Sequence, residues 1–282
     1  MPLPNFLIIG DFKAGTTSLY SYLRQHPEVY MPSAVKELRF FSYDPQNSYH
    51  QRAKSTVVRS LDEYRSHFEA CGEAKAIGEA SPAYLRSPGA AARIHALLPN
   101  ARLIVCLRNP ADRLHSAHQM RYRSTKHRRP LDESLFSNDA ALIKANFYWL
   151  DLSRYFELFP REHIHVILFE ELIRDPAAAA RGVYEFLGVD PHFVPDFAVQ
   201  NAGGMPRNVL LYRSFDGLRK LLKSAGVTSR AARNASAKLR RGLLTRVPLD
   251  PLLRRQILEV CRDDIQRTQQ LIGRDLSDWL RQ

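Results

Sequence analysis

Short uninterrupted apolar runs alternate with stretches of helical periodicity along the first two thirds of the chain. The runs Phe6–Ile9 and Leu103–Leu107 contain no polar residue, which is typical of parallel strands buried on both faces. Between such runs, apolar residues recur at the spacing of amphipathic helices. The pattern predicts strands over 6–10, 76–79, 102–108 and 164–169, and helices over 17–25, 89–97, 111–125, 145–158 and 176–187. This alternation predicts an α/β fold, with a central parallel sheet flanked by helices on both faces.

The rest of the chain fits a single domain of this kind. A further helix is predicted over 250–270, where Leu253, Ile257 and Ile265 recur at helical spacing. No internal repeat interrupts the pattern, and no apolar run approaches the roughly 20 residues that cross a bilayer. The chain has 282 residues, of which 45% are hydrophobic and 25% charged, as in ordinary globular proteins. We therefore expect one domain over residues 1–282.

The first apolar run leads into a loop with the chemistry of an anion site. In Gly10-Asp-Phe-Lys13-Ala-Gly15-Thr16-Thr17-Ser18, a lysine, two glycines and three hydroxyl side chains precede or open a predicted helix. Glycines let backbone N–H groups approach a phosphate, and a helix N-terminus carries partial positive charge. Gly10 and Gly15 have the spacing of the nucleotide-binding loop, but Thr16 stands where that loop has its lysine. The loop is either a phosphate or sulfate cradle or a plain turn with hydroxyl caps.

A second candidate anion site follows the run Leu103–Leu107. Arg108 ends this predicted strand, and Ser116 lies eight residues further along, on the next predicted helix. Open α/β sheets bind ligands at the carboxyl ends of their strands. An ATP-dependent enzyme would more often have a carboxylate there to hold magnesium. A cation suits a second anionic group with no metal between, whereas Arg108 considered alone could equally form a structural ion pair.

Both motifs together resemble the sulfotransferases that use 3′-phosphoadenosine 5′-phosphosulfate (PAPS). Lys13-Ala-Gly-Thr-Thr-Ser18 is similar to that family's 5′-phosphosulfate loop, and Arg108 with Ser116 is similar to its 3′-phosphate site. Two further segments match the branch that contains heparan sulfate sulfotransferases and soluble bacterial relatives: Lys36-Glu37-Leu38-Arg39-Phe40-Phe41 and Gly78-Glu79-Ala80-Ser81-Pro82-Ala83-Tyr84-Leu85. The closing segment Leu271–Trp279 also resembles the end of such domains. The resemblance therefore covers nearly the whole chain.

This resemblance implies the parts of a site for sulfuryl transfer from PAPS, with 3′,5′-bisphosphoadenosine (PAP) as product. Lys13 would stabilise the leaving phosphate. Donors around the sulfate would come from Ala14, Gly15, Thr16, Thr17 and Ser18. Arg108 and Ser116 would hold the 3′-phosphate, and Arg207 lies where the family closes a loop over the cofactor. Glu37 is implied as the general base.

Some roles stay open at this point. Three histidines, His26, His115 and His118, are reserve candidates for the base, and Glu37 could instead form a salt bridge with Lys36 or Arg39. Arg113 could assist at the 3′-phosphate or pair with a surface acid.

The acceptor side is less defined by sequence. Glu79, Ser81 and Tyr84 are expected to bind the acceptor, which would carry a hydroxyl or amine on a glycan, a lipid or a natural product. The heparan sulfate enzymes have a lysine where this chain has Ala80, and a histidine and an aspartate where it has Arg39 and Ser42. These differences argue against a heparan-type acceptor. The competing functions are a nucleotide kinase-like phosphotransferase with an atypical phosphate loop and a non-catalytic anion-binding module.

The distribution of charge and the spacing of the cysteines limit the partners and the kinds of site that we expect. The net charge is +12, and residues 212–246 hold ten lysines and arginines against one acid, Asp216. This basic segment is either a solvated helical surface or a mobile flap that attracts an acidic acceptor or a membrane surface. No nucleic-acid reader motif accompanies it. Cys71, Cys106 and Cys261 form no paired motif, so we expect neither a disulfide framework nor a metal site.

The position of the first strand bears on location. The chain enters that strand by Phe6, which leaves no room for a signal peptide or a transmembrane stem. We therefore expect a soluble, cytoplasmic, bacterial protein. Its oligomeric state is not predicted.

Overall fold

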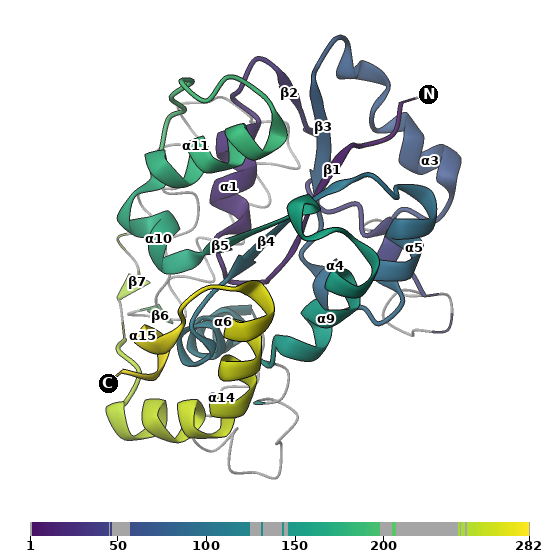
Figure 1. Ribbon diagram of the computed structural model, residues 1–282. Coiled ribbons are helices and arrows are strands. Elements are labelled where there is room, and N and C mark those ends of the chain that lie inside the picture. Colours follow the sequence, from purple (N-terminus) through teal and green to yellow (C-terminus); the bar gives the residue numbers. More distant parts are fainter. Residues whose placement is uncertain are drawn as a thin grey trace.

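The structure is a computed structural model that describes residues 2–44, 46, 57–124, 131, 143, 146–197, 205–206, 242, 244–245 and 247–281. At its centre lies a five-stranded sheet in the order β2-β3-β1-β4-β5 (Figure 1). All neighbouring strands in it run parallel. The strands are β1 (Phe6–Gly10), β2 (Val29–Tyr30), β3 (Ala76–Ala80), β4 (Arg102–Leu107) and β5 (Ile164–Leu168). This sheet confirms the predicted α/β fold.

Each face of the sheet has its own hydrophobic core, because successive residues of a strand point to opposite sides. On one face, Phe6 and Ile8 of β1 and Cys106 of β4 pack with apolar residues of three helices. These helices are α1 (Thr16–Leu23), α10 (Phe169–Arg174) and α11 (Pro176–Leu187). Cys106 is completely buried, as its place in an apolar run predicted.

On the opposite face, Leu7 and Ile9 of β1 and Val105 of β4 belong to the second core. The helices here are α4 (Ala83–Arg86), α5 (Ala90–Leu97) and α9 (Trp149–Leu158). Figure 1 shows the two groups of helices on either side of the sheet, with α6, α14 and α15 below it. These are α6 (Pro110–Ser124), α14 (Pro251–Ile272) and α15 (Ser277–Leu280).

Every strand and helix predicted from the pattern is present, with ends displaced by a few residues. The largest displacement is in helix 145–158, which begins at Trp149, and the tail 250–270 is α14. The elements that the pattern did not predict are short: β2, α4, α10 and α15, together with α3 (Leu61–Ser66) and the 3₁₀ helices η1 (Phe40–Ser42), η2 (Glu69–Cys71) and η3 (Arg161–His163). Such elements contain too few residues for a period to show. A separate two-stranded antiparallel pair joins β6 (Met205–Pro206) to β7 (Leu244–Thr245).

Candidate active site

The chain leaves β1 through a tight turn that requires glycine at one position. Lys13 has a φ of 67° and Gly15 a φ of 91°, both in the left-handed region. A Cβ atom at residue 15 would stand 2.6 Å from Leu172 Cδ2 of α10. Glycine therefore serves both the backbone conformation and the close approach to α10. The side chain of Lys13 reaches the other way, with Nζ 3.8 Å from Met120 Sδ of α6.

The start of α1 is built to receive an anion. No side chain caps its first turn, and no acidic residue lies in that turn. Unpaired N–H groups and the helix dipole attract negative charge at such a place. Lys36, from the loop after β2, adds a full charge, since its Nζ lies 3.2 Å from Thr17 Oγ1. Burial lowers the pKa of Lys36, and a bound anion would offset this effect. In the sequence analysis, Lys36 was considered as part of a motif and as a partner of Glu37, but not as a ligand of the sulfate.

Arg108 stands at the carboxyl end of β4, beside this turn, because β1 and β4 are neighbours in the sheet. Its Nη1 donates to the carbonyl of Lys13 at 3.0 Å, and its guanidinium lies over the Phe169 ring at 4.3 Å from the centroid. The Tyr148 hydroxyl donates to the Arg108 carbonyl at 2.8 Å. Burial lowers the pKa of Arg108, and its Nε is buried without a hydrogen-bond partner. An anionic group at this place would satisfy both the charge and the open donor.

Ser116 lies on α6 and is half-buried. No described contact joins it to Arg108. Arg108 precedes α6 and Ser116 lies well inside that helix, so a shared role for them rests on the resemblance.

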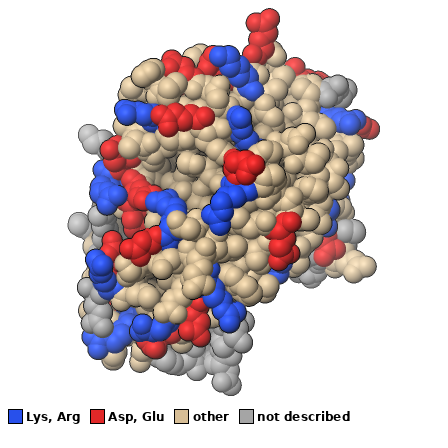
Figure 2. All heavy atoms as spheres, viewed as in Figure 1, with Lys and Arg blue, Asp and Glu red and all other residues tan. Residues whose placement is uncertain are grey.

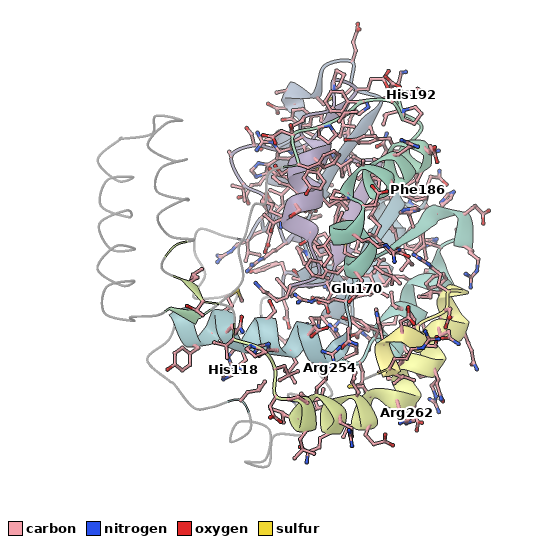
Figure 3. All side chains as sticks on the ribbon, turned by 90° about the vertical axis from the view of Figure 1, so that its left-hand side faces the viewer. His118, Glu170, Phe186, His192, Arg254 and Arg262 are labelled. Carbon is pink, nitrogen blue, oxygen red and sulfur yellow. The ribbon has the colours of Figure 1, made fainter. Side chains whose placement is uncertain are left out.

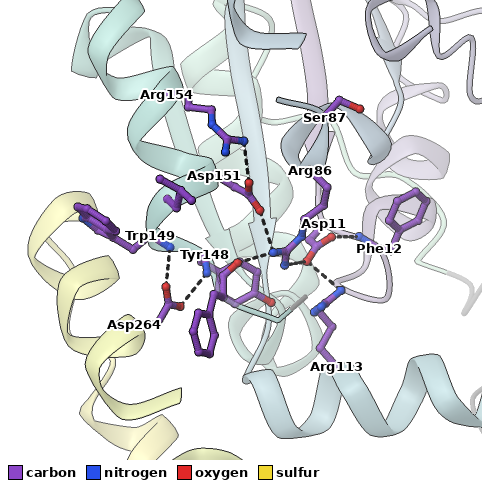
Figure 4. Close-up of polar contacts among 12 residues, drawn as sticks. Asp11, Phe12, Arg86, Ser87, Arg113, Tyr148, Trp149, Asp151, Arg154 and Asp264 are labelled. Carbon is purple, nitrogen blue, oxygen red and sulfur yellow. Dashed lines mark hydrogen bonds and ion pairs between the residues drawn. The ribbon is translucent and has the colours of Figure 1, made fainter. Parts of the chain in front are cut away.

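The carboxylate of Asp11, which the sequence analysis did not single out, is buried and anchors the turn after β1 (Figure 4). Asp11 is 0% exposed, and its Oδ2 lies 2.6 Å from Arg86 Nη2 of α4 and 3.1 Å from Arg113 Nη1 of α6. Its Oδ1 accepts the N–H of Phe12 at 2.6 Å. Arg86 continues to Asp151 of α9 at 2.9 Å. Asp11 thus ties three helices to the turn, and Arg113 pairs with this interior carboxylate.

Glu37 lies between two cations. Its Oε2 is 2.6 Å from Arg39 Nη2, and its Oε1 is 3.6 Å from Lys36 Nζ. The Glu37 side chain is 25% exposed, so it stays accessible to a second molecule. A cavity of about 410 Å³ is lined by Lys36, Thr17 and Tyr20 among others, so it reaches the partner of Glu37 and not Glu37 itself. The salt bridges that the sequence left as an alternative for Glu37 are therefore present, beside an open cavity.

Glu79, Ser81 and Tyr84 do not line that cavity. All three are 0% exposed, and the hydroxyls of Ser81 and Tyr84 donate to the Glu79 carboxylate at 2.6 and 2.5 Å. Burial raises the pKa of Glu79 to about 7 despite these donors. Direct contact of these side chains with an acceptor, which the sequence led us to expect, has no support here because they lie inside the protein. Strand alternation explains the result: Glu79 is paired with Leu7 across β3 and β1, on the face of the second core.

Comparison with known proteins settles the class of this site. A model of the sulfotransferase family matches residues 4–193. The chain belongs to the sulfotransferase family. The crystal structure of a sulfotransferase from Alicyclobacillus acidocaldarius matches it with a TM-score of 0.74 and 30% sequence identity, over 100% of both chains. Family and neighbour together identify an enzyme that transfers sulfuryl groups, and they do not favour the kinase-like alternative.

Two curated relatives of this sulfotransferase are much longer proteins. Bifunctional heparan sulfate N-deacetylase/N-sulfotransferase 3 of Homo sapiens is 30% identical over 211 residues, which are 68% of this chain and 23% of the relative. Membrane-associated sulfotransferase kil1 of Dictyostelium discoideum is 39% identical over 111 residues, which are 39% of this chain and 21% of the relative. The matched region thus covers less than a quarter of either relative. The acceptor of this protein is therefore not inferred from theirs.

The three reserve histidines of the sulfotransferase have different surroundings. His26 is 2% exposed, and its Nε2 lies 2.9 Å from the Asp190 carbonyl oxygen, which makes it a structural residue. His115 Nε2 lies 3.0 Å from Gln119 Nε2, and burial lowers the pKa of His115. Glu170 of α10 accepts the N–H of Asn109, the residue before α6 begins. His118 lies further along α6, away from Glu170 (Figure 3). None of the three has a described contact with Glu37 or Lys13.

Some predictions concern parts of the sulfotransferase that the structure does not describe. Arg207 and nearly all of the basic segment 212–246 lie outside the described residues.

On the face shown in Figure 2, positive and negative side chains are interspersed. Within the described ranges, no group of three or more His, Cys, Asp or Glu side chains could hold a metal ion. No helix in the same ranges is long and apolar enough to cross a membrane.

Proposed function

We propose that this sulfotransferase takes its sulfuryl group from PAPS and transfers it to a hydroxyl or amine of an acceptor. The observation that carries the proposal is the contact between the two predicted phosphate sites. Arg108 donates to the carbonyl of Lys13 at 3.0 Å while its Nε stays buried without a partner. The two connected residues therefore offer donors to two anionic groups, as a nucleoside with phosphates at its 3′ and 5′ positions requires.

The residues of the turn would hold the phosphosulfate end. PAPS supplies an activated sulfuryl group whose transfer leaves negative charge on the departing phosphate. Lys13 would place its ammonium at that charge. The sulfate would be surrounded by N–H and hydroxyl donors, because Thr16 opens the uncapped helix α1. These donors come from Ala14, Gly15, Thr16, Thr17 and Ser18. Lys36 joins this set through its contact with Thr17.

Arg108 and Ser116 would hold the 3′-phosphate, with Arg207 as a further donor. The cation at the end of β4, the burial that lowers its pKa despite the nearby carboxylates of Asp112 and Glu170, and its open Nε support this role for Arg108. The roles of Ser116 and Arg207 rest on the resemblance alone.

Glu37 is proposed as the base that accepts the proton of the acceptor. It is a partly exposed carboxylate beside Lys36, which in turn touches Thr17 of the sulfate cradle. The acceptor would approach through the cavity of about 410 Å³ that Lys36 and Thr17 line. Arg39 and Lys36 hold the carboxylate in place, so its orientation is set before an acceptor arrives.

The acceptor is proposed to be a hydroxyl- or amine-bearing glycan, lipid or natural product. Arg39 binds Glu37 directly, whereas the resemblance places a histidine there in the heparan sulfate enzymes. This difference supports an acceptor other than heparan. A single domain over 1–282, a cytoplasmic location, a bacterial source and independence from metal ions stay predictions from the sequence.

Calorimetry and a transfer assay test the proposal. We expect PAP to bind without a metal, with the same affinity in EDTA, and more tightly than ATP with magnesium. Transfer from radiolabelled PAPS is then measured with p-nitrophenol, glucosamine and dodecanol as probe acceptors, and with extracts of the host. Glu37→Gln should abolish most transfer and leave PAP binding unchanged, while Glu162→Gln, an exposed matched control, should do neither. Tighter binding of ATP with magnesium would favour the phosphotransferase instead.

A further inference from the structure

The segment that carries Glu37 turns sharply at Arg39. Arg39 has a φ of 57°, a left-handed conformation that is uncommon outside glycine, asparagine and aspartate. Such a conformation persists only where surrounding contacts determine it. The 3₁₀ helix η1 begins directly after this residue. The contacts of the Arg39 backbone therefore decide where the arginine side chain and its partner Glu37 stand.

Ser81 holds the backbone of Arg39 from inside the protein. Its Oγ accepts the Arg39 N–H at 3.0 Å and donates to Glu79 Oε2 at 2.6 Å. A serine hydroxyl has one hydrogen to donate and lone pairs to accept with. Because Ser81 gives its hydrogen to the carboxylate, its lone pairs face Arg39. The direction of this contact is thus set by Glu79.

Glu79 is itself fixed from the other side. Its Oε1 accepts the hydroxyls of Tyr64 at 3.1 Å and Tyr84 at 2.5 Å. All four side chains are 0% exposed, so water does not compete for these hydrogen bonds. Three hydroxyl donors match a group that only accepts. The cluster therefore has one arrangement of its hydrogens while Glu79 is ionised.

The arginine side chain completes the connection. Both Nη2 and Nε of Arg39 donate to Glu37 Oε2, at 2.6 and 3.2 Å. On the carbonyl side, the Ser42 hydroxyl donates to the Arg39 oxygen at 3.0 Å. Arg39 is thus held at its N–H, its carbonyl and its guanidinium, and two of these contacts lie between Glu79 and Glu37.

We propose that Glu79 is a positioning residue for Glu37, acting through the Ser81 hydroxyl and the left-handed turn at Arg39. This inference rests on the proposed role of Glu37 as base. It replaces the expected contact of Glu79 and Ser81 with the acceptor by an indirect role: the buried cluster sets the orientation of a carboxylate that it does not touch. Substitution in the cluster should then change the rate of transfer without changing the binding of PAP.

The test compares Ser81→Ala with Ser87→Ala. Ser87 is a matched control on the same segment, since its hydroxyl donates to the Ala83 carbonyl at 3.0 Å. Its backbone N–H donates to the Tyr84 carbonyl at 3.1 Å, a contact that the substitution keeps. Hydrogen exchange of the Arg39 amide should become about fivefold faster in Ser81→Ala, as expected for one lost hydrogen bond. It should not change in Ser87→Ala. This measurement needs neither PAPS nor an acceptor.

Activity is then measured with radiolabelled PAPS and whichever of the three probe acceptors reacts fastest. In Ser81→Ala, kcat should fall about ten- to a hundredfold, the range for a misplaced catalytic group, while the PAPS KM and PAP affinity stay within about twofold. Ser81→Thr keeps the hydroxyl and should restore most of kcat. If Ser81→Ala does not fold, Tyr64→Phe, which removes one donor to Glu79, should lower kcat less but in the same pattern.

Two results would overturn the inference. One is an unchanged kcat in folded Ser81→Ala, and the other is an equal loss of kcat and PAP affinity, which would indicate general damage. If the wild-type protein neither binds PAP nor transfers sulfate, the proposed function fails instead, and the Arg39 exchange rate alone decides whether the cluster holds the turn.

Discussion

The carboxylate of Asp11 allows the sharpest prediction about stability. It is 0% exposed and pairs with Arg86 and Arg113 at 2.6 and 3.1 Å. Asp11→Asn keeps the size of the side chain and an oxygen for the Phe12 N–H, but removes the buried charge that Arg86 and Arg113 share and leaves Arg86 with Asp151. Breaking a buried pair by removing one partner costs about 3–5 kcal/mol. Because the amide retains one hydrogen bond, we expect the lower end, about 3 kcal/mol.

The same substitution at Asp112 provides the control. Asp112 pairs with Arg254 at 2.6 Å, but these side chains are 34% and 29% exposed. A pair that remains in contact with water contributes less than about 1 kcal/mol. Urea unfolding of the wild type, Asp11→Asn and Asp112→Asn at one pH and salt concentration measures the two free energies of unfolding. In thermal unfolding, the Asp11 variant should lose about 6 °C or more in Tm.

Equal losses in the two variants would refute the reasoning, because burial would then make no difference. A loss below about 1 kcal/mol for Asp11→Asn would also refute it, and would show that Arg86 and Arg113 find other partners. PAP affinity should fall in Asp11→Asn as well, since the carboxylate holds the turn that contains Lys13.

Three further predictions concern single side chains. Lys13→Ala should lower kcat about 10²- to 10³-fold with a smaller effect on PAP binding, in steady-state kinetics and calorimetry, because its charge counts most as the leaving oxygen develops. Arg108→Ala should weaken PAP binding by about 2–4 kcal/mol in calorimetry; an unchanged affinity would remove Arg108 from the site. The pKa of Glu79 is raised from 4.5 to about 7 by burial, so between these values the folded protein keeps a proton that the unfolded chain loses. Wild-type stability should therefore fall by up to about 3 kcal/mol as pH rises from 5 to 7, and urea unfolding of Glu79→Gln should lack this slope; parallel curves would contradict the raised pKa.

The fold could be predicted from the sequence because its main elements are long enough to show a pattern. The runs Phe6–Ile9 and Leu103–Leu107 lie in the central strand β1 and the interior strand β4. Strands at the end of a sheet give less signal, and β2 has only the two residues Val29 and Tyr30. The motifs around Lys13 and Arg108 identified the two ends of the candidate site, since ligand sites in open sheets lie at strand ends.

The partners of buried charges could not be predicted in the same way. Asp11 and Arg86 are 75 residues apart in sequence, and nothing in their local surroundings indicates that they meet. One signal was present for Asp11, a carboxylate directly after a buried strand. Glu79 lies among apolar residues of β3, which is typical of a buried position. The motif that contains it led us to expect a contact with the acceptor instead. The packing of the second core decided the outcome.

The hydrogen bond from Arg108 to the Lys13 carbonyl also affects how mutations in this protein should be combined. Arg108 is assigned to one phosphate and Lys13 to the other, yet each helps to fix the position of its neighbour. Residues in direct contact usually give non-additive free energies. A double-mutant cycle on this pair would therefore report a coupling term, and the separate effects of the two substitutions would not sum to that of the double variant. We therefore expect the two halves of the proposed nucleotide site to behave as one thermodynamic unit.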